Sequence, residues 1–64
     1  MANPEIYLTS EQVRRRYHIS DMSLWRWLHD QKLLFPRPIY IRRRRYWLAD
    51  ELDAFDAAQR AAGA

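Results

Sequence analysis

The side chains best equipped for chemistry in this sequence are arginines, and they are concentrated in the middle of the chain. Residues 12–46 carry ten of the eleven Lys and Arg residues against two acidic ones, a net charge of +8, whereas residues 1–11 carry −2 and residues 47–64 carry −3. A basic middle with acidic ends is typical of a protein that binds a polyanion. We therefore expect nucleic acid as the partner. A membrane surface fits less well, because the basic residues alternate with aromatic ones instead of following one long amphipathic helix.

The sequence offers little for catalysis or metal binding. It has two histidines, His18 and His29, on different predicted elements, and no cysteine. The lack of cysteine excludes disulfides and thiolate metal sites and is typical of a protein of the reducing cytosol. No apolar run is long enough to span a membrane, and residues 1–10 do not have the pattern of a signal peptide. We expect no catalytic residue, no metal, no cofactor, and a cytoplasmic, nucleoid-associated location.

A short helix over residues 21–30, capped by Ser20, is where we expect sequence-specific contacts. At about 100° per residue, Leu24, Trp27 and Leu28 share one side of this helix, which predicts that this side faces the core. The opposite side presents polar and amphipathic side chains that suit the major groove of DNA. The predicted contact residues on this helix are Asp21, Met22, Ser23, Trp25 and Arg26.

Several of these side chains have more than one possible role. The fork of Arg26 matches the O6 and N7 atoms of guanine, but it matches a phosphate nearly as well. Met22 and Ser23 suit a base edge or a thymine methyl group. Asp21 either accepts a hydrogen bond from cytosine N4 or complements the positive end of the helix dipole. Trp25 either packs in the core or reaches a phosphate with its indole N–H, and the sequence leaves both open.

The elements before this helix predict how it is held. Thr9 and Gln12 have the spacing of a capping box, which predicts a helix over residues 10–17. Residues 18–20 then leave a turn of the length found in helix-turn-helix units. We expect His18 to adopt a left-handed backbone, where glycine is ideal and histidine is among the tolerated residue types.

The residues after the central helix predict a hairpin and a last helix. Two runs, 38–41 and 45–48, are rich in β-branched and aromatic residues. Arginines fill the connection between them, and no Gly, Asn or Asp defines its turn type. A helical period returns at Ala49. The predicted contact residues of the hairpin are Arg42, Arg43, Arg44 and Arg45.

Together these elements predict one domain over residues 1–64, mainly α with a small β-hairpin. The expected architecture is a compact winged helix-turn-helix, in which a two-stranded wing and a C-terminal helix follow the helix pair. Residues 1–6 are expected to form a flexible arm and residues 61–64 to fray. The expected core consists of Leu24, Trp27, Leu28, Tyr46, Trp47, Leu52 and Phe55.

Three segments in this order resemble a known family. They are residues 8–28 (LTSEQVRRRYHISDMSLWRWL), 35–41 (FPRPIYI) and 44–47 (RRYW). They are similar to the AlpA-type regulators of phage and prophage origin, within the MerR and excisionase superfamily. The resemblance implies that the second helix enters the major groove and that the wing lies along the minor groove or the backbone. The chain departs from the family pattern at His18, a place often held by glycine, and in its arginine-rich wing.

Other basic residues are predicted to hold the DNA backbone, which fixes register rather than sequence. They are Arg14, Arg15, Arg16, Lys32 and Arg37.

The resemblance implies a small transcriptional regulator of prophage or mobile-element genes that binds a specific DNA sequence. An alternative is an excisionase, a recombination directionality factor that works with an integrase. A protein-interaction module without DNA binding is a further alternative, and RNA binding is another. A domain of 64 residues covers one short half-site, so we expect it to act with itself, as a dimer or a cooperative array on DNA. No small-molecule effector is expected.

Overall fold

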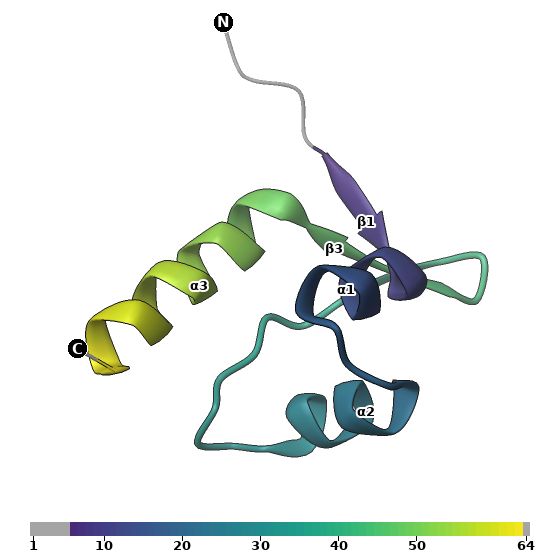
Figure 1. Ribbon diagram of the computed structural model, residues 1–64. Helices are drawn as coiled ribbons and strands as arrows, with labels where there is room; N and C mark the ends of the chain where they lie inside the picture. Colours follow the sequence, from purple (N-terminus) through teal and green to yellow (C-terminus); the bar gives the residue numbers. More distant parts are fainter. Residues whose placement is uncertain (1–5, 64) are drawn as a thin grey trace, which may run out of the picture.

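The computed structural model describes residues 6–63, which form three helices and a three-stranded antiparallel sheet (Figure 1). In chain order the elements are β1 (Tyr7–Thr9), α1 (Ser10–Tyr17), α2 (Asp21–His29), β2 (Ile39–Ile41), β3 (Arg44–Leu48) and α3 (Ala49–Gly63). The predicted first helix is confirmed at both ends, and the central helix ends one residue earlier than predicted. The last helix continues through residues 61–63, where we expected fraying.

The predicted signals for α1 are present at both of its ends. The Thr9 hydroxyl accepts a hydrogen bond from the Gln12 amide at 3.2 Å, and the Gln12 side chain accepts one from the Thr9 amide at 2.9 Å. His18 follows the helix with φ 55° and ψ 46°, the expected left-handed conformation. The amide of Ile19 then donates to the Arg14 carbonyl at 3.0 Å, as in a Schellman motif. These contacts fix the direction in which the chain enters α2.

The sheet has one strand more than the predicted hairpin. Its strand order is β1-β3-β2, so β3 is central and pairs with both neighbours. Leu8 of β1 lies opposite Trp47, which places the residues just before α1 against the hairpin. Ile6 is 62% exposed, but its carbonyl accepts a hydrogen bond from the Ala49 amide at 2.8 Å. This bond attaches Ile6 to the start of α3. The remainder of the predicted arm, residues 1–5, lies outside the described residues.

One apolar core joins the helices to the sheet. Its buried side chains are Val13, Leu24, Leu28, Phe35, Trp47 and Leu52. Of the other expected core residues, Trp27 and Phe55 are half-buried and pack against this core, and Tyr46 is half-buried. The indole of Trp47 donates to the Pro36 carbonyl at 3.0 Å, which satisfies its polar atom inside the core.

An aromatic cluster connects the long loop to the helices. The ring of Phe35, in the loop between α2 and β2, meets Trp27 at 5.4 Å, Tyr17 at 5.8 Å and Phe55 at 5.0 Å between centroids, each edge to face. Such contacts stabilise a packed aromatic pair beyond the area that it buries. The loop is therefore attached to α1, α2 and α3 at one point.

Polar contacts attach α3 to α1. Arg16 contacts Asp53 at 2.7 Å and Asp56 at 2.6 Å, and the Tyr17 hydroxyl donates to Asp56 at 2.7 Å. Burial raises the pKa of Tyr17 to about 12, and the hydrogen bond to Asp56 adds to this shift. Burial alone would raise the pKa of Asp56, but the hydrogen bonds from Arg16 and Tyr17 outweigh it and lower that pKa.

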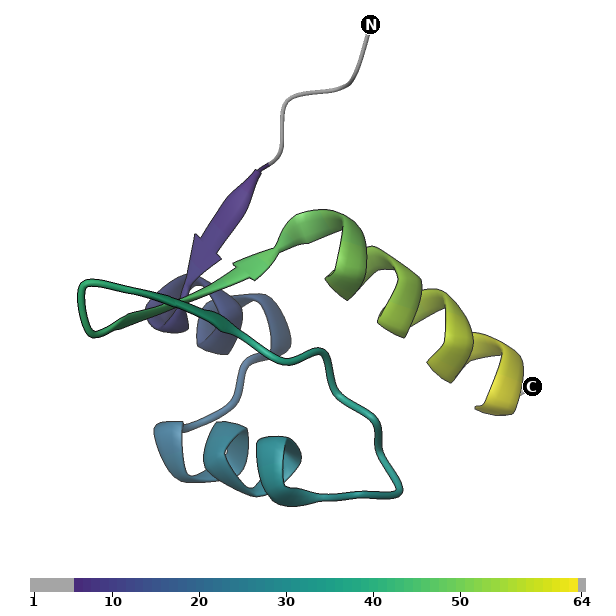
Figure 2. The same cartoon turned by 180° about the vertical axis from the view of Figure 1, so that it is seen from behind.

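The arrangement leaves α2 on the outside of the molecule. Figures 1 and 2 show α2 along one side, with α1 between it and the strands β1 and β3. The turn of the β2–β3 hairpin and the C-terminal end of α3 extend in opposite directions (Figure 1). Within residues 6–63, no helix combines the length and the apolar character that crossing a membrane requires.

Candidate nucleic-acid interface

The start of α2 is fixed by its own cap. The Ser20 hydroxyl accepts a hydrogen bond from the Ser23 amide at 3.1 Å and lies 3.2 Å from the Ser23 hydroxyl. Leu24 and Leu28 are buried and anchor the inner side of the helix, as predicted. Ser23 is half-buried and belongs to the cap, so its hydroxyl is less available to a ligand than the sequence alone indicates.

The outer side of α2 carries large exposed side chains. Met22 is 61% exposed and Trp25 is 53% exposed, so Trp25 is not a core residue, which answers a question that the sequence leaves open. Arg26 and His29 are exposed beside them. The His29 ring stacks on Trp25 at 4.1 Å between centroids, and its Nδ1–H donates to the Trp25 carbonyl at 2.8 Å. The stack packs the exposed indole ring against the last residue of α2.

Arg45 links the hairpin to the start of α2. Its guanidinium lies 3.6 Å from the Asp21 carboxylate and over the Trp47 ring at 5.6 Å. The Arg45 side chain is 27% exposed. We predicted Asp21 and Arg45 as separate DNA contacts, but the structure brings them together as a brace between two elements. This contact joins the hairpin to the first residue of α2.

The hairpin turn has a conformation that its residue types disfavour. Arg42 and Arg43 have φ values of 49° and 69°, and Ile41 pairs with Arg44 across the turn. Two central residues with positive φ define a type I′ turn, which normally contains Asn-Gly. A residue with a Cβ atom costs about 1–2 kcal/mol in this region. The sequence left the turn type open. The structure shows a type I′ turn in which both central residues are arginines with strained backbone conformations.

Three arginines from two elements converge on one hollow in the surface. The hollow is lined by Thr9, Ser10, Glu11, Arg14, Arg43 and Arg44. The Nε atom of Arg14 is buried and has no hydrogen-bond acceptor among the described residues. Glu11 is the one acidic lining residue, and it already contacts Arg15 at 2.7 Å. Like charges in such proximity repel, so the hollow is suited to an anion that supplies acceptors from outside the chain.

The remaining predicted backbone contacts have different surroundings. Arg16 is held by Asp53 and Asp56, so its charge is neutralised within the protein. Arg15 is exposed in its surface ion pair with Glu11. Lys32 lies beyond the end of α2, beside α3 and away from the hairpin, whereas Arg37 is exposed just before β2. The structure therefore does not gather these four residues with the arginines of the hollow.

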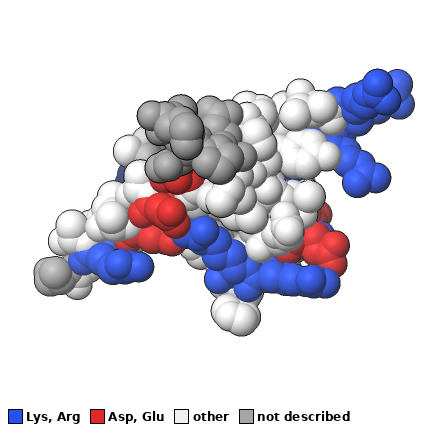
Figure 3. Space-filling model, turned by 90° about the horizontal axis from the view of Figure 1, so that it is seen from above, with Lys and Arg blue, Asp and Glu red and all other residues white. Residues whose placement is uncertain are grey.

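Figure 3 shows the same difference on the surface. Basic side chains project alone at the hairpin end of the molecule, and others lie beside acidic side chains over the helices. The guanidinium groups of Arg42, Arg43 and Arg44 make no ion pair within the part of the chain that the structure describes. The hairpin therefore carries a group of neighbouring arginines without ion-pair partners among the described residues, in addition to single exposed cations such as Arg26 and Arg37.

Two parts of this surface were missed from the sequence. Tyr40 on β2 is 70% exposed and lies opposite Arg45, so an exposed aromatic ring accompanies the arginines. No polar and apolar alternation in Ile39, Tyr40 and Ile41 marks this ring, because all three side chains are apolar or aromatic and all three are exposed. Thr9 and Ser10, which we considered only for the helix cap, also line the arginine hollow.

No protein-family model, curated protein or solved structure matches this chain.

Proposed function

We propose that this protein is a winged helix-turn-helix DNA-binding protein that recognises a specific sequence in double-stranded DNA. In this proposal the outer side of α2 enters the major groove, and the β2–β3 hairpin is the wing that lies on the backbone or in the minor groove. The turn of three residues between α1 and α2 and the rigid inner side of α2 support this geometry. The expected role is a small regulator of prophage or mobile-element genes.

The convergence of Arg14, Arg43 and Arg44 is the observation that carries this proposal. A phosphate group offers several acceptor oxygens and a negative charge, which matches a hollow lined by three arginine side chains. Because the arginines come from α1 and from the hairpin, one phosphate would connect both elements. The nearby amides at the start of α1 add positive potential at the same place.

Strain in the hairpin turn supports the same assignment. A turn made of Asn-Gly would adopt the observed backbone at lower cost than Arg42-Arg43 does. Strained residues at the protein surface often mark functional sites, and here they are also the residues with the highest local positive charge. Two guanidinium groups at the tip are well placed to follow a DNA backbone or to enter a narrow minor groove.

Base recognition is assigned to the exposed residues of α2. Arg26 would bind a guanine edge, and a good bidentate contact of this kind is worth about 1–3 kcal/mol of discrimination. Met22 and Trp25 present apolar surface suited to thymine methyl groups. The Asp21 carboxylate lies 3.6 Å from the Arg45 guanidinium, so we assign it to positioning the helix relative to the wing.

A gel-shift titration tests the proposal directly. The probe is duplex DNA that covers the region upstream of the protein's own gene, with RNA and random duplex DNA as competitors. If Arg14, Arg26, Arg42, Arg43 and Arg44 contact phosphates or bases, the slope of log K against log salt should be about −4 to −5. A slope near zero, or equal competition by RNA, would contradict the proposal. A footprint on the same DNA separates a regulator from an excisionase by the number and spacing of protected segments.

One observation favours a second candidate, a protein-interaction module. Met22 and Trp25 line a small hollow with Asp21 on the outer side of α2, and exposed Met and Trp side chains are frequent at protein interfaces. This candidate predicts that Met22→Ala reduces binding to a partner more than Arg26→Ala does. DNA binding predicts the reverse order when affinity for duplex DNA is measured.

A further inference from the structure

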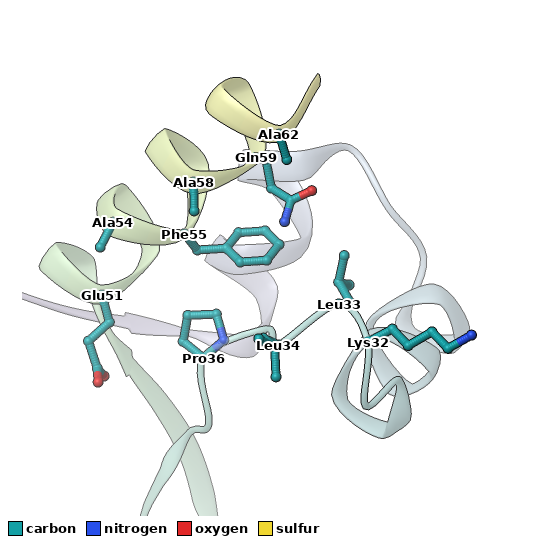
Figure 4. Close-up of a pocket in the computed structure, with 10 residues that line it drawn as sticks. All are labelled: Lys32, Leu33, Leu34, Pro36, Glu51, Ala54, Phe55, Ala58, Gln59 and Ala62. Atoms are coloured by element: carbon teal, nitrogen blue, oxygen red, sulfur yellow. The ribbon is translucent and has the colours of Figure 1, made fainter. Parts of the chain in front are cut away.

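A groove runs between α3 and the loop that follows α2, at the end of the molecule away from the hairpin (Figure 4). Side chains on one side of α3 form one wall, and residues 32–36 form the other. The walls are mostly apolar, and they include Leu33, Leu34, Pro36, Ala54, Ala58 and Ala62. Figure 4 shows the alanines following one another along the helix, with the ring of Phe55 between the helix and the loop. The alanines leave room for another chain to approach closely.

Leu34 makes this groove unusual for a surface that faces only water. Its side chain is 79% exposed, the highest value among the exposed large apolar residues. A small-molecule site would have several polar groups that converge on its centre. The charged residues here, Lys32 and Glu51, stand at opposite ends instead (Figure 4). The surface therefore suits a protein segment with apolar side chains more than a small ligand.

The two charged residues at the ends of the groove indicate which protein segment would bind there. Neither the Lys32 ammonium nor the Glu51 carboxylate has an ion-pair partner within residues 6–63. If a twofold axis perpendicular to the groove related two copies, their grooves would face each other and run in opposite directions. Lys32 of each copy would then face Glu51 of the other. The same operation would bring Leu34 of each copy toward the alanine wall of the other. The groove is therefore complementary to a second copy of itself. Its basic end matches the acidic end of the other copy, and its exposed leucine matches the alanine wall of the other copy.

We propose that this groove is the surface through which two copies of this chain associate as a twofold dimer. The proposal does not depend on DNA binding, and it can be tested without DNA. Its consequence for DNA rests on the proposed function. Two copies joined through the groove would then present two recognition helices to one DNA duplex. Half-sites one helical turn apart are separated by about 34–36 Å.

Sedimentation equilibrium of the full chain, in buffer without DNA, is the first test. We expect reversible self-association in about the 10–100 μM range, as befits a small and partly polar interface. A chain that remains monomeric at about 1 mM would overturn the proposal. That result would leave the groove to a different protein and would say nothing against DNA binding.

Exchanging the charges gives a sharper test. In Lys32→Glu the ends of the groove become both acidic, and in Glu51→Lys they become both basic, so each variant alone should associate at least about 10-fold more weakly. A mixture of the two variants restores both opposite-charge pairs and should associate about as strongly as the original protein. If the mixture associates no better than either variant alone, the proposed pairing is wrong.

A matched pair of variants checks the position of the interface. Ala58→Glu places a carboxylate in the groove, whereas Ala57→Glu makes the same change on exposed α3 surface outside it. We expect Ala58→Glu to weaken association at least about 10-fold and Ala57→Glu to leave it nearly unchanged. Equal effects of the two changes would contradict the proposal. Circular dichroism and thermal unfolding of each variant confirm that a lost association is not lost folding.

Discussion

Arg16 on α1 and the arginines at the hairpin turn are the same residue type in different surroundings. Arg16 lies between Asp53 and Asp56, and these contacts, together with the Tyr17 hydroxyl, attach α3 to the rest of the molecule. Arg42, Arg43 and Arg44 have no acidic neighbour in ion-pair contact within the described residues. The first region uses its charge inside the protein, and the second presents its charge at the surface. The same residue type is therefore neutralised in one region and unpaired in the other, a difference that charge counts alone do not reveal.

The largest expected effect is a loss of affinity for duplex DNA when the hairpin arginines are replaced. Replacing Arg42, Arg43 and Arg44 together by Gln should weaken duplex binding by about 100- to 1,000-fold at about 0.1 M salt, because about three phosphate contacts are lost. The salt slope should become less steep by about 3. Filter binding or fluorescence anisotropy on labelled duplex DNA measures both quantities.

A matched triple variant controls for net charge. Arg15, Arg37 and Arg60 are exposed arginines outside the hollow, and replacing them by Gln removes the same total charge. We expect a much smaller loss of affinity. If both triple variants lose affinity equally, net charge rather than the position of the hairpin determines binding, and the distinction between the two regions disappears.

The second prediction concerns the neutralised region. Arg16→Ala leaves two carboxylates beside each other without their cation, and should lower the free energy of unfolding by about 1–2 kcal/mol in a partly exposed site. Arg15→Ala removes the exposed ion pair with Glu11 at the neighbouring position and should cost at most about 0.5 kcal/mol. Urea unfolding followed by tryptophan fluorescence gives both values. Duplex affinity of the folded Arg16→Ala protein should remain nearly unchanged, and a large loss would place Arg16 in the interface.

The third prediction separates strain from function at the hairpin turn. Arg42→Asn with Arg43→Gly supplies the residues that a type I′ turn prefers, so we expect the free energy of unfolding to rise by about 1 kcal/mol. The same change removes two charges, so duplex affinity should fall by about 10- to 100-fold at about 0.1 M salt. A variant that gains stability without losing affinity would show that the turn is not part of the DNA-binding surface.

The smallest expected effect is a pH dependence of the contact between α1 and α3. The pKa of Tyr17 is raised to about 12 from a value of 10.0, so its contribution to stability is fully present below pH 10 and is lost as the pH rises toward 12. The pKa of Asp56 is lowered from 3.8, so its contribution is present above that pH and is lost in more acidic solution. Denaturant unfolding at a series of pH values measures both limits.

Tyr17→Phe is the variant that assigns the alkaline limit. It keeps the ring in the aromatic cluster and removes the titrating hydroxyl, so the loss of stability between pH 10 and 12 should become smaller. An unchanged alkaline limit would assign the transition to another group.

The sequence determined the local elements because their signals are local. The capping box at Thr9, the cap at Ser20 and the left-handed His18 act over a few residues, and all three are found as predicted. The spacing of Leu24 and Leu28 correctly gave the buried side of α2, since helical periodicity is a property of the segment itself. The basic middle of the chain is likewise a matter of composition.

Only the tertiary structure decided which arginines are available to a partner. Arg14, Arg15 and Arg16 are consecutive, yet one lines the hollow with the hairpin, one pairs with Glu11 and one is held by α3. Asp53 and Asp56 lie 37 and 40 residues away from Arg16 in the chain, so no local pattern indicates these contacts. The third strand, the type I′ turn of two arginines and the groove beside α3 also depend on segments that meet only in the folded state. Local propensities shaped each element, and long-range packing determined which charges the protein neutralises and which it presents.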